Sequence, residues 1–393
     1  MMRNKTAFNG ERLKAARIYR GLTVAELAEK LELQRQTVSM YENNKLNNPE
    51  LVTIAKMSTV LGFPKKFFLE NDKIGIKNGS TYFRALLTTS KKYRNEQTQK
   101  VDFIIKLFRY LNDYIEFPVT NLPPGNYSNP EEAAIVLRKF WNLGDKPIDN
   151  IIYLVEQNGI IVTMFETNTD DIDAFSQLVN VDKLETYLIG CSKNKGTAAR
   201  IHFDVAHELG HILLHEWSED IETLNKDEFK EKEKEANAFA SAFLLPKDAF
   251  IKDVGVYADN LAFYIELKKK WKVSISAMIR RSYNLGLIDS NSYQQLMRTM
   301  QKKGIKKSEP LDDKLFTAQP SLLRTSVQML LEQGVLTPKE FIDELSQDYS
   351  LSLESSEIEK LLDLPKDTLK VVNVTPVHNL NLKSKLIDKV DKD

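Results

Sequence analysis

Two histidines four residues apart carry the clearest chemistry in the sequence. His207 and His211 flank Glu208 in the pattern His-Glu-x-x-His. On an α-helix, residues four apart share one face, so both imidazole rings can bind one metal ion. Zn²⁺ suits imidazole ligands and keeps one position open for water, whose pKa it lowers towards ~7. Glu208 can take the proton from that water, which is the chemistry of a metal-dependent hydrolase.

Histidines are concentrated around this motif. The chain has five, and four of them fall between residues 202 and 215. This concentration favours a metal site over scattered structural histidines. His215 lies two helical turns beyond His207, about 12 Å along the axis, so the three histidines of this helix cannot share one ion. We therefore expect His215 to be a structural or cleft residue.

A third protein ligand is expected from the helix predicted just downstream of the motif. Its small residues Ala236 and Ala240 would let it approach the metal helix closely. Glu233 shares this face with Asn237, so Glu233 is the preferred ligand and Asn237 is expected to orient a ligand histidine. Glu235 lies about 200° round the helix from Glu233 and is the alternative ligand.

Both motifs together resemble a known family. The run His-Glu-Leu-Gly-His-x-x-Leu-His, followed by Glu-x-Glu-Ala-Asn-x-Phe-Ala-x-x-x-Leu-x-Pro, is similar to the ImmA/IrrE family of bacterial metallopeptidases. The resemblance covers roughly residues 130–285. It implies a zincin fold, with a small twisted sheet packed on the metal helix, and selective cleavage of a repressor protein. Asp204 stands where such proteins often have a hydroxyl residue, and we expect it to cap the metal helix.

Hydrophobic patterns predict the elements around the motif. Strands are expected at 160–165, 173–179 and 186–190. The 173–179 strand is the candidate sheet edge that pairs with an extended substrate. Helices are expected at 131–141, 148–157, 261–271, 276–285, 290–302, 321–333, 338–348 and 355–364.

The first 70 residues alternate short helical patterns with short breaks, which is typical of a helix-turn-helix. One helix is expected over 11–19, and a second begins after Thr23, with Glu26 completing a capping box. A third is expected over 34–42. Amide and guanidinium groups on its exposed face can read purine edges in the major groove, and the residues after it can hold phosphates. The expected DNA contacts are Gln34, Arg35, Gln36, Ser39, Met40, Asn44 and Lys45.

The run Tyr41-Glu42-Asn43-Asn44-Lys45 resembles the Cro/cI-type (XRE) DNA-binding domain, where many relatives have Trp-Glu-x-Gly-Lys. Asn44 replaces that glycine, and asparagine tolerates the left-handed backbone that such a turn needs. Charge agrees with this resemblance. Residues 1–94 contain 18 Lys and Arg against 8 Asp and Glu, a balance of +10, whereas the remainder has a balance of −10. A basic first quarter favours double-stranded DNA as a partner of that part of the chain.

Residues 71–129 form a connector. Within it, residues 95–116 predict one amphipathic helix with an apolar stripe at Val101, Ile104, Ile105, Phe108, Leu111 and Ile115. The stripe can pair with a second copy in a homodimer, which would suit two DNA half-sites, or it can pack within the monomer.

Composition places few further limits on the chain. Hydrophobic residues make up 42% and charged residues 28%, as in an ordinary soluble protein, and Cys191 is the only cysteine. A lone cysteine fits a reducing cytosol, and no apolar run is long enough to cross a membrane. We therefore expect a cytoplasmic protein without a membrane span.

Together these patterns predict a multidomain, mainly α protein with an α+β part. Its expected parts are an all-α helix-turn-helix domain at 8–70, the connector at 71–129, a zincin-like metallopeptidase domain at 130–285 and a helical C-terminal region at 286–393. The expected function is a bacterial transcription regulator with a zinc-dependent endopeptidase that cleaves a repressor after a stress or mobile-element signal. The alternative is a DNA-binding regulator whose peptidase-like domain senses a ligand or partner and cleaves nothing.

Overall fold

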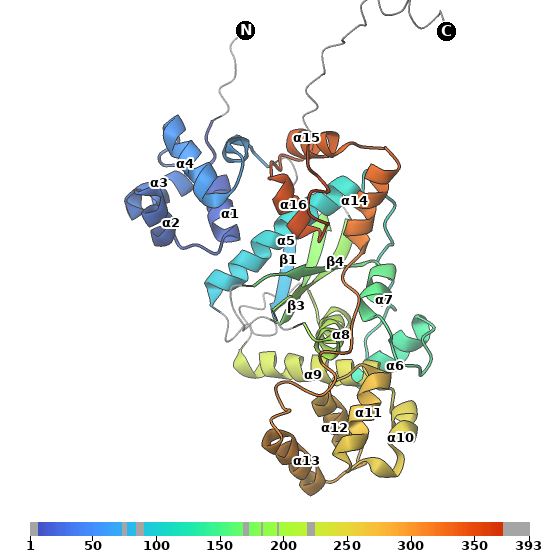
Figure 1. The fold of residues 1–393 in the computed structure, drawn as a ribbon. Helices are drawn as coiled ribbons and strands as arrows, with labels where there is room; N and C mark the ends of the chain where they lie inside the picture. The colour runs from blue at the N-terminus through green and yellow to red at the C-terminus, as the bar shows by residue number, and fades with distance from the viewer. Residues whose placement is uncertain are drawn as a thin grey trace, which may run out of the picture.

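Figure 1 shows a small helical domain on one side of a central sheet, with further helices on both faces of that sheet. The computed structural model describes residues 7–72, 77–83, 90–167, 173–181, 184–194, 196–217 and 225–371, with the backbone alone for 77–83, 181 and 184. The end of the expected C-terminal region, residues 372–393, lies outside the described residues.

The N-terminal domain is a bundle of four α-helices and one 3₁₀ turn: α1 (Gly10–Tyr19), α2 (Val24–Leu31), α3 (Arg35–Glu42), α4 (Leu51–Leu61) and η1 (Lys65–Leu69). The predicted capping box is confirmed, because the Thr23 hydroxyl accepts from the Glu26 amide while the Glu26 carboxylate accepts from the Thr23 amide. The two residues hold the start of α2, and a short turn sets α2 against α3.

The sheet has four strands, β1 (Lys77–Phe83), β2 (Ile160–Phe165), β3 (Ala174–Val181) and β4 (Leu184–Ser192), in the order β1-β3-β4-β2. β2 is parallel to β4, and the other two pairings are antiparallel. The expectation that 173–179 forms a sheet edge is wrong, because β1 pairs with β3 along that side. The sequence of β1, Lys-Asn-Gly-Ser-Thr-Tyr-Phe, lacks the alternation that predicts a strand, and ladder hydrogen bonds use backbone groups of any sequence.

Each face of the sheet belongs to a different hydrophobic core, because successive strand residues point to opposite faces. Phe175, Val179 and Leu188 join a core that also contains α5 (Lys91–Leu111) and the helix-turn-helix domain. Ala174 and Ile189 join a second core around α8 (Ala198–Leu214). The motif helix and α5 therefore lie on opposite faces of one sheet, and the N-terminal domain packs against α5.

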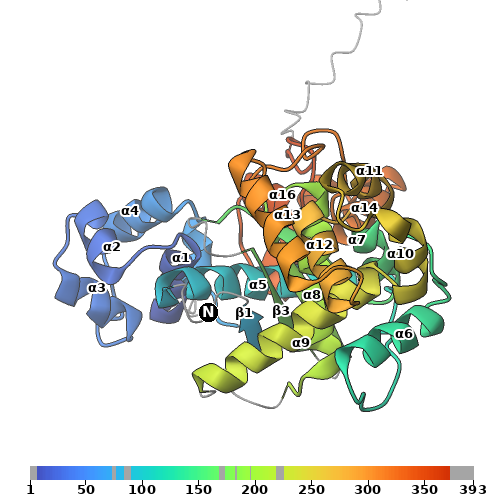
Figure 2. The same cartoon turned by 90° about the horizontal axis from the view of Figure 1, so that it is seen from below.

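The other helices of the second core lie on the α8 side of the sheet (Figures 1 and 2). They are α6 (Pro130–Phe140), α7 (Ile151–Gln157), α9 (Lys226–Leu244), α10 (Lys247–Val254), α11 (Leu261–Trp271), α12 (Ile275–Asn284) and α13 (Ser290–Lys302), and the short η3 (Gly255–Tyr257) follows α10. The sequence did not predict α10. Among the described residues, no helix combines the length and apolar content that crossing a bilayer requires.

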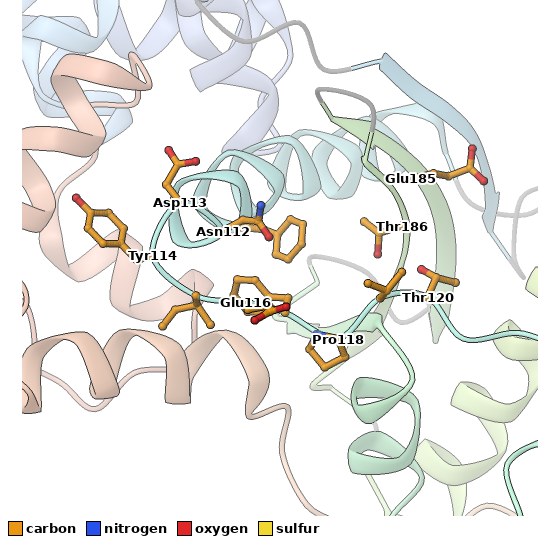
Figure 3. Close-up of a pocket in the computed structure, with 12 residues that line it drawn as sticks. Asn112, Asp113, Tyr114, Glu116, Pro118, Thr120, Glu185 and Thr186 are labelled. Carbon is orange, nitrogen blue, oxygen red and sulfur yellow. The ribbon is translucent and has the colours of Figure 1, made fainter.

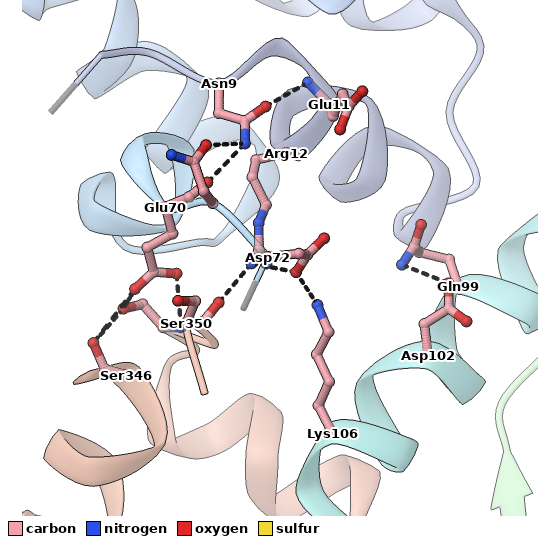
Figure 4. A network of polar contacts seen from close by, with 12 residues as sticks. Asn9, Glu11, Arg12, Glu70, Asp72, Gln99, Asp102, Lys106, Ser346 and Ser350 are labelled. Carbon is pink, nitrogen blue, oxygen red and sulfur yellow. Dashed lines mark hydrogen bonds and ion pairs between the residues drawn. The ribbon is translucent and has the colours of Figure 1, made fainter. Parts of the chain in front are cut away.

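The last three helices pack in the core that contains α5 and the N-terminal domain. These are α14 (Leu322–Glu332), α15 (Pro338–Asp348) and α16 (Ser355–Leu361), which lie over α5 in Figure 1. Polar contacts tie them to the DNA-binding domain. The buried Arg12 guanidinium donates to the Ser350 carbonyl at 2.7 Å and pairs with Asp72 at 2.6 Å, and Lys106 of α5 contacts the same carboxylate (Figure 4).

A second contact joins the same two parts. Glu357 of α16 accepts a hydrogen bond from the Tyr19 hydroxyl at 2.6 Å and pairs with Arg20 at 2.8 Å. Burial and the Glu357 carboxylate raise the pKa of Tyr19 well above its ordinary value, so this phenol stays a donor. The C-terminal helices therefore brace the DNA-binding domain against α5.

The apolar stripe of α5 packs within the chain. Its residues Val101, Ile104, Ile105, Phe108 and Leu111 are at most 3% exposed, and Ile115, which follows the end of the helix, is half-buried against the same core. The stripe could have paired with a second copy or packed within the monomer, and the structure shows that it packs within the monomer. The stripe therefore offers no surface for a homodimer.

Two cavities lie in the same half of the molecule. One, of about 410 Å³, lies between the end of α5, the segment after it and the start of β4, and Figure 3 shows Asn112, Glu116 and Thr186 around it. The other, of about 550 Å³, lies where α1, α5, the end of β2 and α16 meet. The residues that line them include no motif histidine.

Candidate metal centre and DNA-binding face

The motif helix α8 places its two histidines side by side in the core. His207 and His211 are fully buried, and their Nε2 atoms lie 3.0 Å apart. The helix is capped by Thr197, whose side chain accepts from the Arg200 amide. The prediction that Asp204 caps this helix is wrong, because Asp204 lies within α8 and pairs with Arg200 at 3.8 Å.

α9 brings a carboxylate to the same point. One oxygen of Glu233 lies 3.4 Å from His207 Nε2 and the other lies 3.2 Å from His211 Nε2. The approach depends on small residues, as predicted. A Cβ added to Gly210 would lie 3.2 Å from Ala236 Cα, and both Ala236 and Ala240 are fully buried. Close helix packing therefore sets the reach of the Glu233 side chain.

The three side chains fit a tetrahedral zinc site. Their ligand atoms all lie within 4.8 Å of one another. Four ligands at about 2.0–2.1 Å from Zn²⁺ are roughly 3.3 Å apart in a regular tetrahedron. The separations of 3.0, 3.2 and 3.4 Å are close to that value. Two neutral imidazole nitrogens and a carboxylate are all electron-pair donors, so a shared cation is the partner that satisfies them together.

The ionisation state of Glu233 also fits a zinc site. Burial raises the pKa of Glu233, but hydrogen bonds and attraction from His207 and His211 outweigh it and lower the value to about 2. Glu233 is thus ionised at neutral pH, which is the state that binds a metal.

Glu235 points at a different histidine. Its carboxylate lies 3.1 Å from His215 Nε2, and His215 Nδ1 lies 2.9 Å from His211 Nδ1. The expectation that Asn237 orients a ligand histidine is wrong, because the Asn237 amide donates to the Glu233 carbonyl at 2.6 Å. Burial and the neighbouring His211 lower the pKa of His215 to about 3, so His215 is neutral at physiological pH. His215 contacts His211 and does not belong to the ligand cluster.

Glu208 lies between the motif helix and the sheet. It is fully buried, and the Ser176 hydroxyl of β3 donates a 2.6 Å hydrogen bond to its Oε2 atom. Ser176 is itself fully buried and faces α8 from the strand. The strand therefore fixes the position of this carboxylate beside the histidine pair.

Two other reactive residues lie outside this cluster. His202 is buried near Thr317, with 3.1 Å between its Nε2 atom and the hydroxyl oxygen, and burial lowers its pKa to about 4. Cys191 of β4 is buried, and burial together with the Asp204 and Glu208 carboxylates raises its pKa well above the ordinary value. Its thiol remains protonated, so Cys191 is a poor nucleophile.

The expected DNA-reading side chains lie on one helix. α3 lies at the end of the molecule remote from α6–α13 (Figure 2). Gln34, Arg35 and Gln36 at its start are exposed, while Ser39 and Met40 are half-buried. The buried Glu42 holds α3 against α1 through two contacts with Arg17, at 2.5 and 2.9 Å. In the part of the chain that the structure describes, the start of α3 is thus open to solvent.

The turn after α3 has the backbone that the sequence predicts. Asn44 has a φ of +54°, in the left-handed region. Its side-chain oxygen accepts a 2.8 Å hydrogen bond from the Gly10 amide, so Asn44 also holds the start of α1. A Cβ at Gly10 would lie 1.9 Å from the Tyr41 carbonyl oxygen, which explains the glycine there. Lys45 is exposed beside this turn.

Sequence reasoning missed two of these contacts. Ser176 reaches Glu208 from 32 residues away, and no motif marks it as a partner. The contacts that link Glu235 to His215 and His215 to His211 were also missed. Both histidines belong to the first motif, and Glu235 belongs to the second. The one available signal was the third histidine at 215, four residues after His211.

Comparison with protein families agrees with this geometry. Residues 13–68 match the model described as helix-turn-helix, and residues 155–283 match the model described as IrrE N-terminal-like domain. No curated protein sequence matches the chain significantly. The two matched segments contain α3 and the candidate metal cluster, respectively. The chain therefore joins a helix-turn-helix domain of the XRE type to a metallopeptidase-type domain of the ImmA/IrrE kind.

Proposed function

We propose that this chain is a transcription regulator that binds double-stranded DNA through α3 and cleaves a repressor protein at a zinc centre. Cleavage would follow a stress or mobile-element signal. A regulator that acts on chromosomal DNA and on a repressor would work in the cytoplasm. The proposal rests above all on one observation. His207, His211 and Glu233 present their ligand atoms at the spacing of a tetrahedral site, and Glu208 follows His207 on α8.

Each side chain of the site then has a defined task. His207, His211 and Glu233 would hold Zn²⁺, and Glu208 would take the proton of the attacking water and later deliver it to the leaving amine. Zinc supplies Lewis acidity, which lowers the pKa of a water and polarises a peptide carbonyl. Ser176 keeps the Glu208 carboxylate in place through its 2.6 Å hydrogen bond.

The burial of Glu208 supports catalysis over sensing. A carboxylate that is removed from water is expensive for the fold unless hydrogen bonds or nearby charge compensate for it. Glu208 is 0% exposed and is not one of the three clustered ligand residues. A domain that only senses a ligand needs no carboxylate at this place, whereas a hydrolase needs a base beside its metal.

The fusion of the two domains supports a repressor as the substrate. A helix-turn-helix brings the peptidase-type domain to operator DNA, which is where a repressor also resides. The two domains share contacts through the sheet, α5 and the C-terminal helices, so they form one body in which DNA binding and cleavage can be coupled.

The test uses Glu208→Gln, which is nearly isosteric and removes the base. Chromatin immunoprecipitation of the wild type first identifies the bound promoters and the repressors that share them. In cells with the variant, such a repressor should persist after induction and the promoter should stay off, while DNA and zinc binding remain. General-base loss typically lowers the rate by roughly 10²–10⁴-fold. Normal promoter switching with the repressor intact would instead support a sensor that cleaves nothing.

A further inference from the structure

A chain of three side chains runs from the surface of α9 to the candidate metal centre. Glu235 is 43% exposed, and its Oε2 atom lies 3.1 Å from Nε2 of the buried His215. His215 Nδ1 lies 2.9 Å from His211 Nδ1. The remaining ring nitrogen of His211, Nε2, faces Glu233 and His207. Each imidazole therefore uses both of its nitrogens.

Zinc binding would fix the direction of every hydrogen bond in this chain. If His211 binds the ion through Nε2, its only proton is on Nδ1, and this N–H must donate to His215 Nδ1. His215 Nδ1 is then an acceptor, so the proton of His215 is on Nε2 and donates to Glu235. The tautomer of each ring follows from its neighbour, with no donor facing a donor.

We propose that His215 and Glu235 are positioning residues, which hold His211 in the orientation and tautomer that bind zinc. The inference rests on the zinc centre of the proposed function and adds two residues that act through a ligand. Metal-binding histidines commonly donate their second N–H to a carboxylate or carbonyl, which fixes the ring and raises its basicity. Here a second histidine lies between the ligand and the carboxylate.

His215 lies four residues after His211, so its ring lies on the same face of α8 as the His211 ring. The helix stops at Leu214, and His215 has an extended backbone with φ −114° and ψ 147°. Its amide still donates to the His211 carbonyl at 3.2 Å. His215 thus contacts His211 through both its backbone and its ring.

The chain also links the two helices of the site. Glu233 and Glu235 both come from α9, and they contact His211 directly and through His215, respectively. The two nitrogens of His211 are therefore held from the same helix at two points. A ring held on both sides loses little freedom when it binds an ion, which favours affinity.

The experiment measures the zinc affinity of the full-length protein by competition with a chromophoric chelator, so it needs no substrate. His215→Leu removes the acceptor for His211 Nδ1–H. His215→Asn keeps a side-chain oxygen near the position of Nδ1 and loses only the link to Glu235. Loss of such an outer partner typically weakens metal binding by 10–100-fold. We expect that loss for His215→Leu, and a much smaller one for His215→Asn and for Glu235→Gln.

Glu231→Ala is the matched control, because Glu231 lies on the same helix and its carboxylate pairs with Lys234 at 2.7 Å. It should leave zinc affinity unchanged. Equal zinc affinity in His215→Leu and the wild type would overturn the proposal. So would equal losses in the Leu and Asn variants, because packing alone would then explain the effect.

A second measurement keeps the proposal testable should His215→Leu fail to fold. Nitrogen-15 NMR of histidines in the zinc-loaded wild type reports which ring nitrogen carries the proton. The proposal requires a proton on Nδ1 of His211 and on Nε2 of His215, and the opposite tautomer of His215 would contradict it. Failure of the proposed function would look different from failure of this proposal. The zinc affinities and the histidine tautomers would be as expected, but Glu208→Gln would leave cleavage or promoter switching unchanged.

Discussion

The hydroxyl of Ser176 on β3 donates a 2.6 Å hydrogen bond to the carboxylate of Glu208 on α8. Both side chains are fully buried, so water cannot easily replace the bond when the hydroxyl is removed. The sheet therefore holds the proposed base as well as covering the motif helix.

Ser176→Ala should destabilise the protein and slow cleavage while zinc stays bound. A buried acceptor that loses its donor costs about 1–3 kcal/mol, and more when the acceptor is charged. Chemical denaturation measures the loss of unfolding free energy. Thr186→Val is the matched control, since its buried hydroxyl donates to the Gly159 carbonyl at 3.1 Å, far along the chain from Glu208. A slower cleavage in the control than in Ser176→Ala would contradict a special role for this bond.

Zinc binding should depend on Glu233 much more than on its neighbours in α9. Purified protein should hold about one zinc after dialysis, and His207→Ala or His211→Ala should lose it. Glu233→Ala removes a ligand, so its loss of affinity should exceed the roughly 10–100-fold expected for a residue that contacts a ligand, such as His215, and Glu235→Ala should lose much less. Metal analysis of Glu233→Ala, Glu235→Ala and Glu231→Ala gives the order. Stronger loss in Glu235→Ala than in Glu233→Ala would show that the third ligand is misassigned.

Acid should destabilise the zinc-free protein partly through His202. Burial, followed by the charge of Lys272, lowers the pKa of His202 from 6.5 to about 4. The unfolded chain then binds a proton more readily than the folded one, so this contribution is complete above pH 6.5 and is lost as pH falls to about 4. It amounts to on the order of 3 kcal/mol. In chelator-treated samples, the free energy of unfolding of His202→Gln should fall less than that of the wild type between pH 6.5 and 4. Parallel curves of unfolding free energy against pH would refute this role of His202.

DNA reading should depend on the start of α3. Arg35→Ala and Gln36→Ala should each weaken binding to the natural operator by ~1–3 kcal/mol per lost base contact and binding to random DNA by less. Lys45→Ala is the contrasting variant, because a lost phosphate contact should weaken binding to all sequences and reduce its salt dependence. Fluorescence anisotropy with both DNAs at several salt concentrations separates the two. Equal losses on operator and random DNA in the Arg35 variant would mean that α3 does not read bases there.

The sequence could predict what local spacing determines. His207 and His211 come together because one helical turn joins them, and the capping box of Thr23 and Glu26 follows from three-residue spacing. Glu233 could be anticipated through the small face of Ala236 and Ala240, because such a face signals close helix packing.

Contacts between segments far apart in the chain could not be predicted from local sequence patterns. Ser176 meets Glu208 only when the sheet packs on α8, and β1 joins β3 through backbone hydrogen bonds that its polar sequence does not reveal. Asp204 was misread because α8 begins two turns earlier than the motif suggests. The contact of Glu235 with His215 depends on how α9 packs against the end of α8, which no local pattern in the sequence predicts.

The most direct measurement of the central claim is a mass-spectrometric survey of new protein N-termini in cells at the time when the bound promoters switch. Cells with the wild type should contain a small set of cleavage products, including fragments of a repressor. Those products should be absent with Glu208→Gln and with His207→Ala, although the first variant still binds zinc and DNA. If the same N-termini are present in wild-type and Glu208→Gln cells while the promoters switch, this chain does not act as a peptidase.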